Sequence, residues 1–187
     1  MNIPVEQMKA AYDKHKNLKV AADELGMKWQ TLYWYLKKYN HPVVGDKSKY
    51  GTSKDKLASL SEAHFANLIP EATNMNLARY QSKWDFELYG LKIDIKASTL
   101  HHAGKNARQQ RYCFSVKKQE KYADFIVAFG YSGDVIKKCF LFPQEIISNM
   151  TTVNISEYKS KWSDYEIPLE DLRPFFERYR PCDARQQ

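Results

Sequence analysis

The stretch WDFELYGLKIDIKAS, residues 84–98, predicts a β-hairpin with charged side chains along one face. In its second half, LKIDIKA, apolar residues alternate with charged ones, and the first half, WDFELY, alternates in the same way. A strand with this period of two places its apolar set on one face and its charged set on the other. The pattern therefore predicts a strand pair that belongs to a half-buried sheet. Before the hairpin, the stretch NLARY, residues 76–80, is a candidate for a short strand.

The register of this hairpin follows from its pattern. A two-residue loop of Tyr89 and Gly90 pairs apolar residues with apolar ones and opposite charges with each other, which favours that register. The same loop brings Asp85 opposite Asp94. Tyrosine is an unfavourable first residue for such a turn, so a longer loop is the alternative.

Two carboxylates in this register repel each other unless they share a proton or a cation. The Cβ atoms of Asp85 and Asp94 would be about 4.5–5.5 Å apart. Hard oxygen ligands at this separation suit Mg²⁺, which binds one or two carboxylates and keeps water or phosphate oxygens as its other ligands. Lys96, on the same face, would align a water molecule or stabilise charge on a phosphate. The alternative is a solvated strand face of mixed charges.

These residues resemble the motif of the PD-(D/E)xK nuclease superfamily. The resemblance covers roughly residues 58–145: Asp85 matches the first aspartate, Asp94 the second acid, Lys96 the lysine, and Glu62 the acid on the preceding helix. It implies a mixed α/β nuclease core. No helix is evident between the motif strand and the next long strand, where the family usually has one.

The resemblance also implies a mechanism, the metal-dependent hydrolysis of phosphodiesters. Asp85, Asp94 and the main-chain carbonyl of Ile95 would hold Mg²⁺, for which Mn²⁺ would substitute. Lys96 would align the attacking water. Glu62 has two interpretations of equal weight: a residue of the metal shell, or the last residue of a Ser59-x-x-Glu62 capping box.

The first 40 residues predict three short helices, the last two joined by a tight turn after Gly26, as in a helix-turn-helix. Residues 1–57 hold 11 basic and 6 acidic residues, so they carry most of the net charge of +7. DNA binding is favoured over docking to another protein domain. The expected contacts at the second helix of the motif are Lys28, Trp29, Gln30, Thr31, Tyr33, Trp34 and Lys37.

Two further basic segments are candidates for contacts with DNA. Residues 41–57 read as an extended basic linker that includes Lys47 and Lys49, and residues 58–187 read as the nuclease domain. Lys105, Arg108 and Arg111 lie in a polar loop, residues 101–111, that follows the motif strand. For both segments, a solvated chain with no role in binding is the alternative.

Composition narrows the remaining function classes. There is no long apolar run, the first residues lack the pattern of a secretory signal, and three scattered cysteines indicate neither a zinc site nor a disulfide framework. We therefore expect an intracellular, cytoplasmic protein. The resemblance to the nuclease superfamily, together with the predicted helix-turn-helix, implies an endonuclease of the homing or restriction type that acts on double-stranded DNA, and one candidate site per chain implies a homodimer. The alternatives are a junction-resolving enzyme, a regulator with a degenerate nuclease domain, and a ribonuclease.

Overall fold

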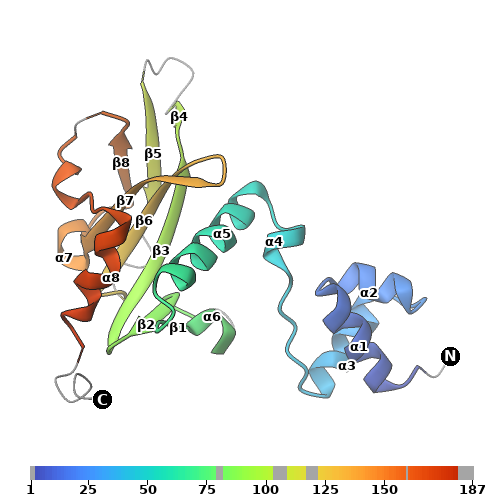
Figure 1. Ribbon diagram of the computed structural model, residues 1–187. Helices are drawn as coiled ribbons and strands as arrows, with labels where there is room; N and C mark the ends of the chain where they lie inside the picture. Colours follow the sequence, from blue (N-terminus) through green and yellow to red (C-terminus); the bar gives the residue numbers. More distant parts are fainter. Residues whose placement is uncertain (1–2, 79–81, 103–108, 117–121, 159, 181–187) are drawn as a thin grey trace. The chain divides into compact units, whose positions relative to one another are not determined.

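The chain divides into two units, Met1–Lys56 and Leu57–Gln187, and each is described by itself. The structure is a computed structural model, and it describes residues 3–78, 82–102, 109–116, 122–158 and 160–180 (Figure 1). Both helices and a mixed sheet are present, so the predicted mixed α/β class is confirmed at that level.

The first unit contains three helices around a small apolar core, as the sequence predicts. They are α1 (Val5–His15), α2 (Leu18–Glu24) and α3 (Trp29–Lys38). The side chain of Asn17 caps α2, and Gly26, at φ +63°, allows the turn before α3. The buried side chains are Met8, Ala11, Tyr12, Ala21, Ala22, Leu25, Leu32 and Leu36.

The prediction of an extended linker over residues 41–57 is wrong from residue 47 onward, whereas residues 41–46 form no helix or strand. This stretch contains the short helix α4 (Lys47–Tyr50), capped by Asp46, and the first turn of α5 (Ser53–Leu68). Thr52 Oγ1 accepts a hydrogen bond from the main-chain N–H of Asp55, and the Asp55 carboxylate accepts one from the N–H of Thr52. This reciprocal capping box starts α5 seven residues before the predicted Ser59 cap.

A five-stranded sheet in the order β1-β2-β3-β6-β7 forms the centre of the second unit. Strands β3 and β6 are parallel, and the other neighbours are antiparallel. The sheet consists of β1 (Thr73–Asn74), β2 (Phe86–Leu88), β3 (Leu91–Thr99), β6 (Phe125–Ser132) and β7 (Val135–Pro143).

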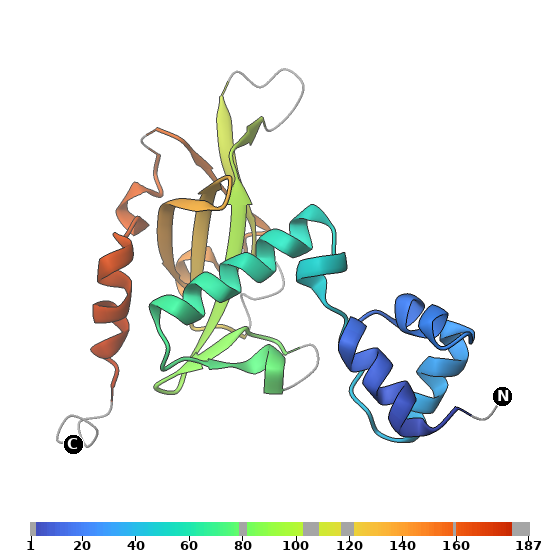
Figure 2. The same ribbon diagram turned by 45° about the vertical axis from the view of Figure 1, so that its right-hand side comes forward.

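Both faces of this sheet are covered. On one face, α5 and α8 (Leu169–Glu177) contribute Phe65 and Phe176 to a core that includes Ile93 and Ile95; α5 runs across the strands in Figures 1 and 2. On the other face lies a second, three-stranded sheet in the order β4-β5-β8. Its strands are β4 (His101–His102), β5 (Gln110–Ser115) and β8 (Thr152–Ser156); α7 (Gln144–Ile147) and the 3₁₀ helix η1 (Ser163–Tyr165) complete the elements on this side.

The contact between the two sheets is close at one glycine. A Cβ atom on Gly130 of β6 would lie 2.8 Å from the ring of Tyr112 in β5. Tyr112 is itself buried in the second core, so its ring has no room to retreat. Glycine at position 130 therefore lets the aromatic residues of β5 pack directly on the backbone of β6.

The predicted hairpin has the expected register. Phe86 pairs with Ile93 and Leu88 with Leu91, leaving Tyr89 and Gly90 as a two-residue loop. Both loop residues have positive φ, +52° and +85°, as in a type I′ turn.

Two other expectations for this unit fail. The predicted strand over residues 76–80 is wrong, because α6 (Met75–Ala78) begins there as a helix. The predicted loop over residues 101–111 begins in β4 and ends in β5. In the described part of the chain between β3 and β6 there is no helix, and residues 103–108 and 117–121, which belong to the segments that would have to supply one, lie outside the described residues.

Candidate functional site

Asp85 lies at the point where β2 stops pairing with β3. The last ladder pair is Phe86–Ile93, and beyond it the N–H of Ile95 donates to Asp85 Oδ2 at 2.8 Å. In a continuous antiparallel ladder this N–H would donate to a main-chain carbonyl. The carboxylate thus takes over a main-chain role, and this fixes its position beside β3.

Asp94 is buried, with 2% of its surface exposed. It shares a face of the sheet with Ile126, its neighbour on β6, and this face is covered by the second sheet. Burial raises the pKa of the Asp94 carboxyl from 3.8 to about 7; nearby Lys96 lowers this pKa and the charge of Asp85 raises it. The charge of Asp85 thus acts on Asp94, although the ladder ends at Phe86–Ile93 and does not pair the two aspartates.

Lys96 contacts the same carboxylate. Its Nζ forms an ion pair with Asp94 Oδ2, although the contact lacks hydrogen-bond geometry. Among the described residues no group donates a hydrogen bond to this oxygen, which is buried. The effect of burial on the Asp94 pKa outweighs that of the Lys96 charge, so the pair leaves a carboxylate whose charge is incompletely compensated.

Glu62 belongs to the same site and does not cap a helix. It lies in the middle of α5, whose capping box is formed by Thr52 and Asp55. The Nδ2 atom of Asn76, in α6, lies 3.3 Å from Glu62 Oε2 and 3.0 Å from Asp85 Oδ1. The structure therefore brings Glu62 beside Asp85 through one shared donor, and the prediction of a Ser59–Glu62 capping box is wrong.

Asn76 was not among the residues that the sequence singled out. It lies in NLARY, which reads as a strand, and a helix of four residues is too short to show a periodic pattern. The signal that would have found it is the register between β1 and β2. Asn74 pairs with Phe86 in that register, which brings the residues after β1 next to Asp85.

The donor set of this site fits a hard cation in its chemistry. It offers carboxylate oxygens from Asp85 and Asp94, the main-chain carbonyl of Ile95, and the carboxylate of Glu62, all ligand types that Mg²⁺ prefers. The buried Asp94 oxygen that lacks a hydrogen bond contacts the Lys96 ammonium, so a metal ion bound there would replace this contact. The described residues contain no ready group of three or more acidic, histidine or cysteine side chains arranged for a metal ion.

The residues expected to contact DNA from the first unit lie at or near the surface of α3. Leu32 and Leu36 point into the core, whereas Lys28 immediately precedes the helix as its N-cap residue. Lys37 lies over the ring of Tyr33 and Lys38 over that of Trp34, so two lysine side chains pack against aromatic rings one turn earlier on this helix. The exposed residues of the predicted set are Lys28, Trp29, Gln30, Thr31, Tyr33, Trp34 and Lys37.

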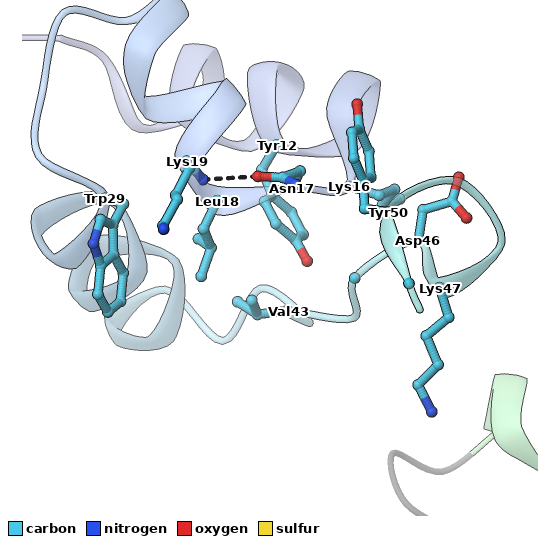
Figure 3. A pocket seen from close by; sticks show the side chains of 12 residues that line it. Tyr12, Lys16, Asn17, Leu18, Lys19, Trp29, Val43, Asp46, Lys47 and Tyr50 are labelled. Atoms are coloured by element: carbon cyan, nitrogen blue, oxygen red, sulfur yellow. Dashed lines mark hydrogen bonds between the residues drawn. The ribbon is translucent and has the colours of Figure 1, made fainter. Parts of the chain in front are cut away.

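A shallow hollow of about 460 Å³ adjoins α3 in the first unit. Figure 3 shows Trp29 at one end and Tyr50 at the other, with Leu18 and Val43 between them. Lys19 and Lys47 also line it. The hollow therefore combines apolar walls with positive charge next to the start of α3.

The remaining basic candidates have different placements. Lys47 and Lys49 are exposed on α4, so they occupy one helical turn and not an extended linker. Arg111 is exposed on β5, where it pairs with His101 and Ser156. Lys105 and Arg108 lie outside the described residues.

Comparisons with known proteins add no family to this geometry. Neither a scan against models of protein families nor a search of curated proteins finds a match. In the described part of the chain, no helix combines the length and the apolar character that a membrane span requires. The function must therefore be argued from the arrangement of the side chains.

Proposed function

We propose that this chain is a Mg²⁺-dependent endodeoxyribonuclease that cuts double-stranded DNA at selected sites. The observation that carries the proposal is the convergence of Asp85, Asp94 and Lys96 where β2 and β3 separate, with Asp94 buried and incompletely compensated. A purely structural strand face would gain nothing from two opposed carboxylates, since burying such a pair costs free energy.

The metal would be held by Asp85, Asp94 and the Ile95 carbonyl, with Glu62 as a further candidate, and Mn²⁺ would substitute for Mg²⁺. When bound, such an ion supplies positive charge to phosphate oxygens and lowers the pKa of a coordinated water. The fixed carboxylate of Asp85, anchored by Ile95 N–H, gives the site a preorganised first ligand.

Lys96 supplies the mobile positive charge of the proposed site. Its Nζ rests against Asp94 in the structure, and 18% of its side-chain surface is exposed, so it can turn from the carboxylate toward a phosphate. An ammonium group there would donate hydrogen bonds to a water or to a phosphate oxygen and would stabilise the negative charge that develops during hydrolysis.

The first unit would act as a helix-turn-helix that directs cutting, with α3 in the major groove. At its start, exposed Gln30 offers an amide that reads bases and exposed Lys28 an ammonium that reaches guanine or a phosphate, and the excess of lysine in this unit offers further phosphate contacts. The described residues of each chain contain one candidate site, so a homodimer or two successive nicks would cut both strands. A cytoplasmic enzyme of the homing or restriction type fits this combination.

The test is the digestion of phage or bacterial genomic DNA with Mg²⁺, with EDTA, and with Lys96→Ala in parallel. Discrete fragments that disappear in both controls are the expected result. A wild-type chain that binds DNA without cutting it under any metal condition would overturn the proposal.

The principal alternative is a DNA-binding regulator whose second unit has lost catalysis. It shares the exposed surface of α3, and it predicts no role for Lys96. A ribonuclease would keep the same site chemistry, and competition between duplex DNA and RNA for the chain would distinguish it.

A further inference from the structure

Asn76 lies between two acidic side chains that come from different elements. Its Nδ2 is 3.3 Å from Glu62 Oε2 on α5 and 3.0 Å from Asp85 Oδ1 before β2. Ionised carboxylates only accept hydrogen bonds, so the NH₂ end of the amide must face both of them. One neutral side chain therefore supplies both of its donor hydrogens to two negative groups.

The chain around Asn76 also holds the main chain of Asp85. The N–H of Met75 donates to the carbonyl of Asp85 at 2.8 Å, and the side chain of Asn74 accepts from the N–H of Asn76 at 2.9 Å. Three consecutive residues thus form a support in which Asn74 orients Asn76, and both Met75 and Asn76 hold Asp85. Such a support restricts the rotation of the carboxylate.

Among the residues that the structure describes, Asn76 donates to one oxygen of Asp85 and Ile95 N–H to the other. A carboxylate oxygen accepts up to two hydrogen bonds or ligand bonds, so within this part of the chain each oxygen retains capacity for one more ligand. The arrangement fixes the carboxylate and leaves it able to bind a cation. Glu62, which takes its donor from the same amide, is held near that position.

We propose that Asn76 is a positioning residue, which holds Glu62 and Asp85 together for a divalent cation. This inference rests on the proposed function, and it adds a residue outside the D-x-K motif together with its role. Asn76 acts on the carboxylates and not on the substrate. Partners that orient metal ligands in this way typically contribute 10–100-fold to metal affinity.

The test measures Mn²⁺ binding to the full chain by isothermal titration calorimetry, and DNA cleavage in parallel. Asn76→Ala is expected to weaken Mn²⁺ binding about 10-fold or more and to lower kcat more than it raises KM for DNA. Asn76→Gln, which keeps the amide donor, is expected to recover part of the affinity. Asn67→Ala, which removes an exposed amide from α5, serves as the matched control and should leave both properties unchanged.

The outcomes separate this inference from the proposed function. Wild-type Mn²⁺ affinity and cleavage in Asn76→Ala, in a chain that does cut DNA, would overturn the role of Asn76 and leave the nuclease intact. A lower unfolding temperature alone, with unchanged metal affinity, would likewise show that Asn76 is merely structural. A wild-type chain that neither binds Mn²⁺ nor cuts DNA would overturn both proposals.

Discussion

Asp85 accepts a hydrogen bond from the main-chain N–H of Ile95 at 2.8 Å, where a continuous ladder would provide a carbonyl. Ile95 is buried, so this N–H would be without a partner if the carboxylate were removed. The same side chain thus joins two tasks, pairing the end of a strand and presenting oxygen atoms to the site.

Substitution of Asp85 should separate these two tasks. We expect Asp85→Ala to lower the free energy of unfolding by about 1–3 kcal/mol, the cost of a buried unpaired N–H. Asp85→Asn keeps one carbonyl oxygen and should cost less, yet both variants should lose cleavage. Urea unfolding and a cleavage assay check this, and an Asp85→Ala variant as stable as the wild type would contradict the anchoring role.

Glu62 should matter for activity and not for helix formation. Glu62→Gln retains an oxygen for Asn76 and lies far from the start of α5, so we expect a change in stability within about 0.5 kcal/mol and at least 10-fold slower cleavage. Asp55→Ala is the matched control, because it removes the observed capping box and should cost about 1 kcal/mol while leaving cleavage intact. Thermal melts and cleavage rates of the two variants give the answer, and the reverse pattern would return Glu62 to a structural role.

The raised pKa of Asp94 predicts a pH-dependent stability of the metal-free chain. Between pH 3.8 and about 7 the folded chain retains a proton that the unfolded chain has released, so the free energy of unfolding falls as pH rises. Above that range Asp94 is ionised in both states, and the folded chain bears the full free-energy cost of burying its charge. The shift corresponds to at most about 4 kcal/mol, and Asp94→Asn removes it together with the ion pair to Lys96.

Urea unfolding in EDTA at pH 5 and pH 8 measures this effect. We expect the stability of Asp94→Asn relative to wild type to increase by about 3 kcal/mol between the two pH values. Asp134→Asn, in the exposed turn between β6 and β7, is the control for the loss of one carboxylate. Equal pH dependence of the wild type and Asp94→Asn would show that the Asp94 carboxyl titrates normally.

The hairpin was predictable because its period of two and its loop agree on one register. A one-residue shift would move Ile93 and Ile95 out of the core, so the pattern alone excludes most alternatives. The pairing in the second unit is therefore encoded locally. The closeness of Asp85 and Asp94 follows from it.

Other features depend on contacts that the local pattern does not contain. The charged face of β3 is interpreted as a metal site or, alternatively, as a solvated face, and nothing in its pattern predicts that the second sheet covers it and buries Asp94. The helix α6 spans only four residues, and α5 begins in a stretch whose glycine, serine and lysine content suggests a linker. Burial of a charge and the position of Asn76 arise only when distant segments pack together.

Residues at the exposed start of α3 should determine how well the chain distinguishes its cut site from other DNA. Gln30 and Lys28 are exposed and contribute nothing to the core, so their removal should leave the unit folded. If they read bases, Gln30→Ala should reduce discrimination between the cut site and random DNA by about 1–3 kcal/mol. If Lys28 contacts a phosphate, Lys28→Ala should weaken binding to both DNAs and lower the salt dependence by about one ion.

Gel-shift titrations over a range of salt concentrations, with a fragment that contains the cut site and one that does not, measure both effects. Lys9→Ala on α1 is the control for a lost positive charge in the same unit, since this lysine already pairs with Glu6. Leu32→Ala is a second control, because it opens the core and should cost about 2–5 kcal/mol with loss of all binding. Unchanged discrimination in a folded Gln30→Ala chain would mean that α3 does not read the sequence, and the selectivity of cutting would then have to come from the second unit.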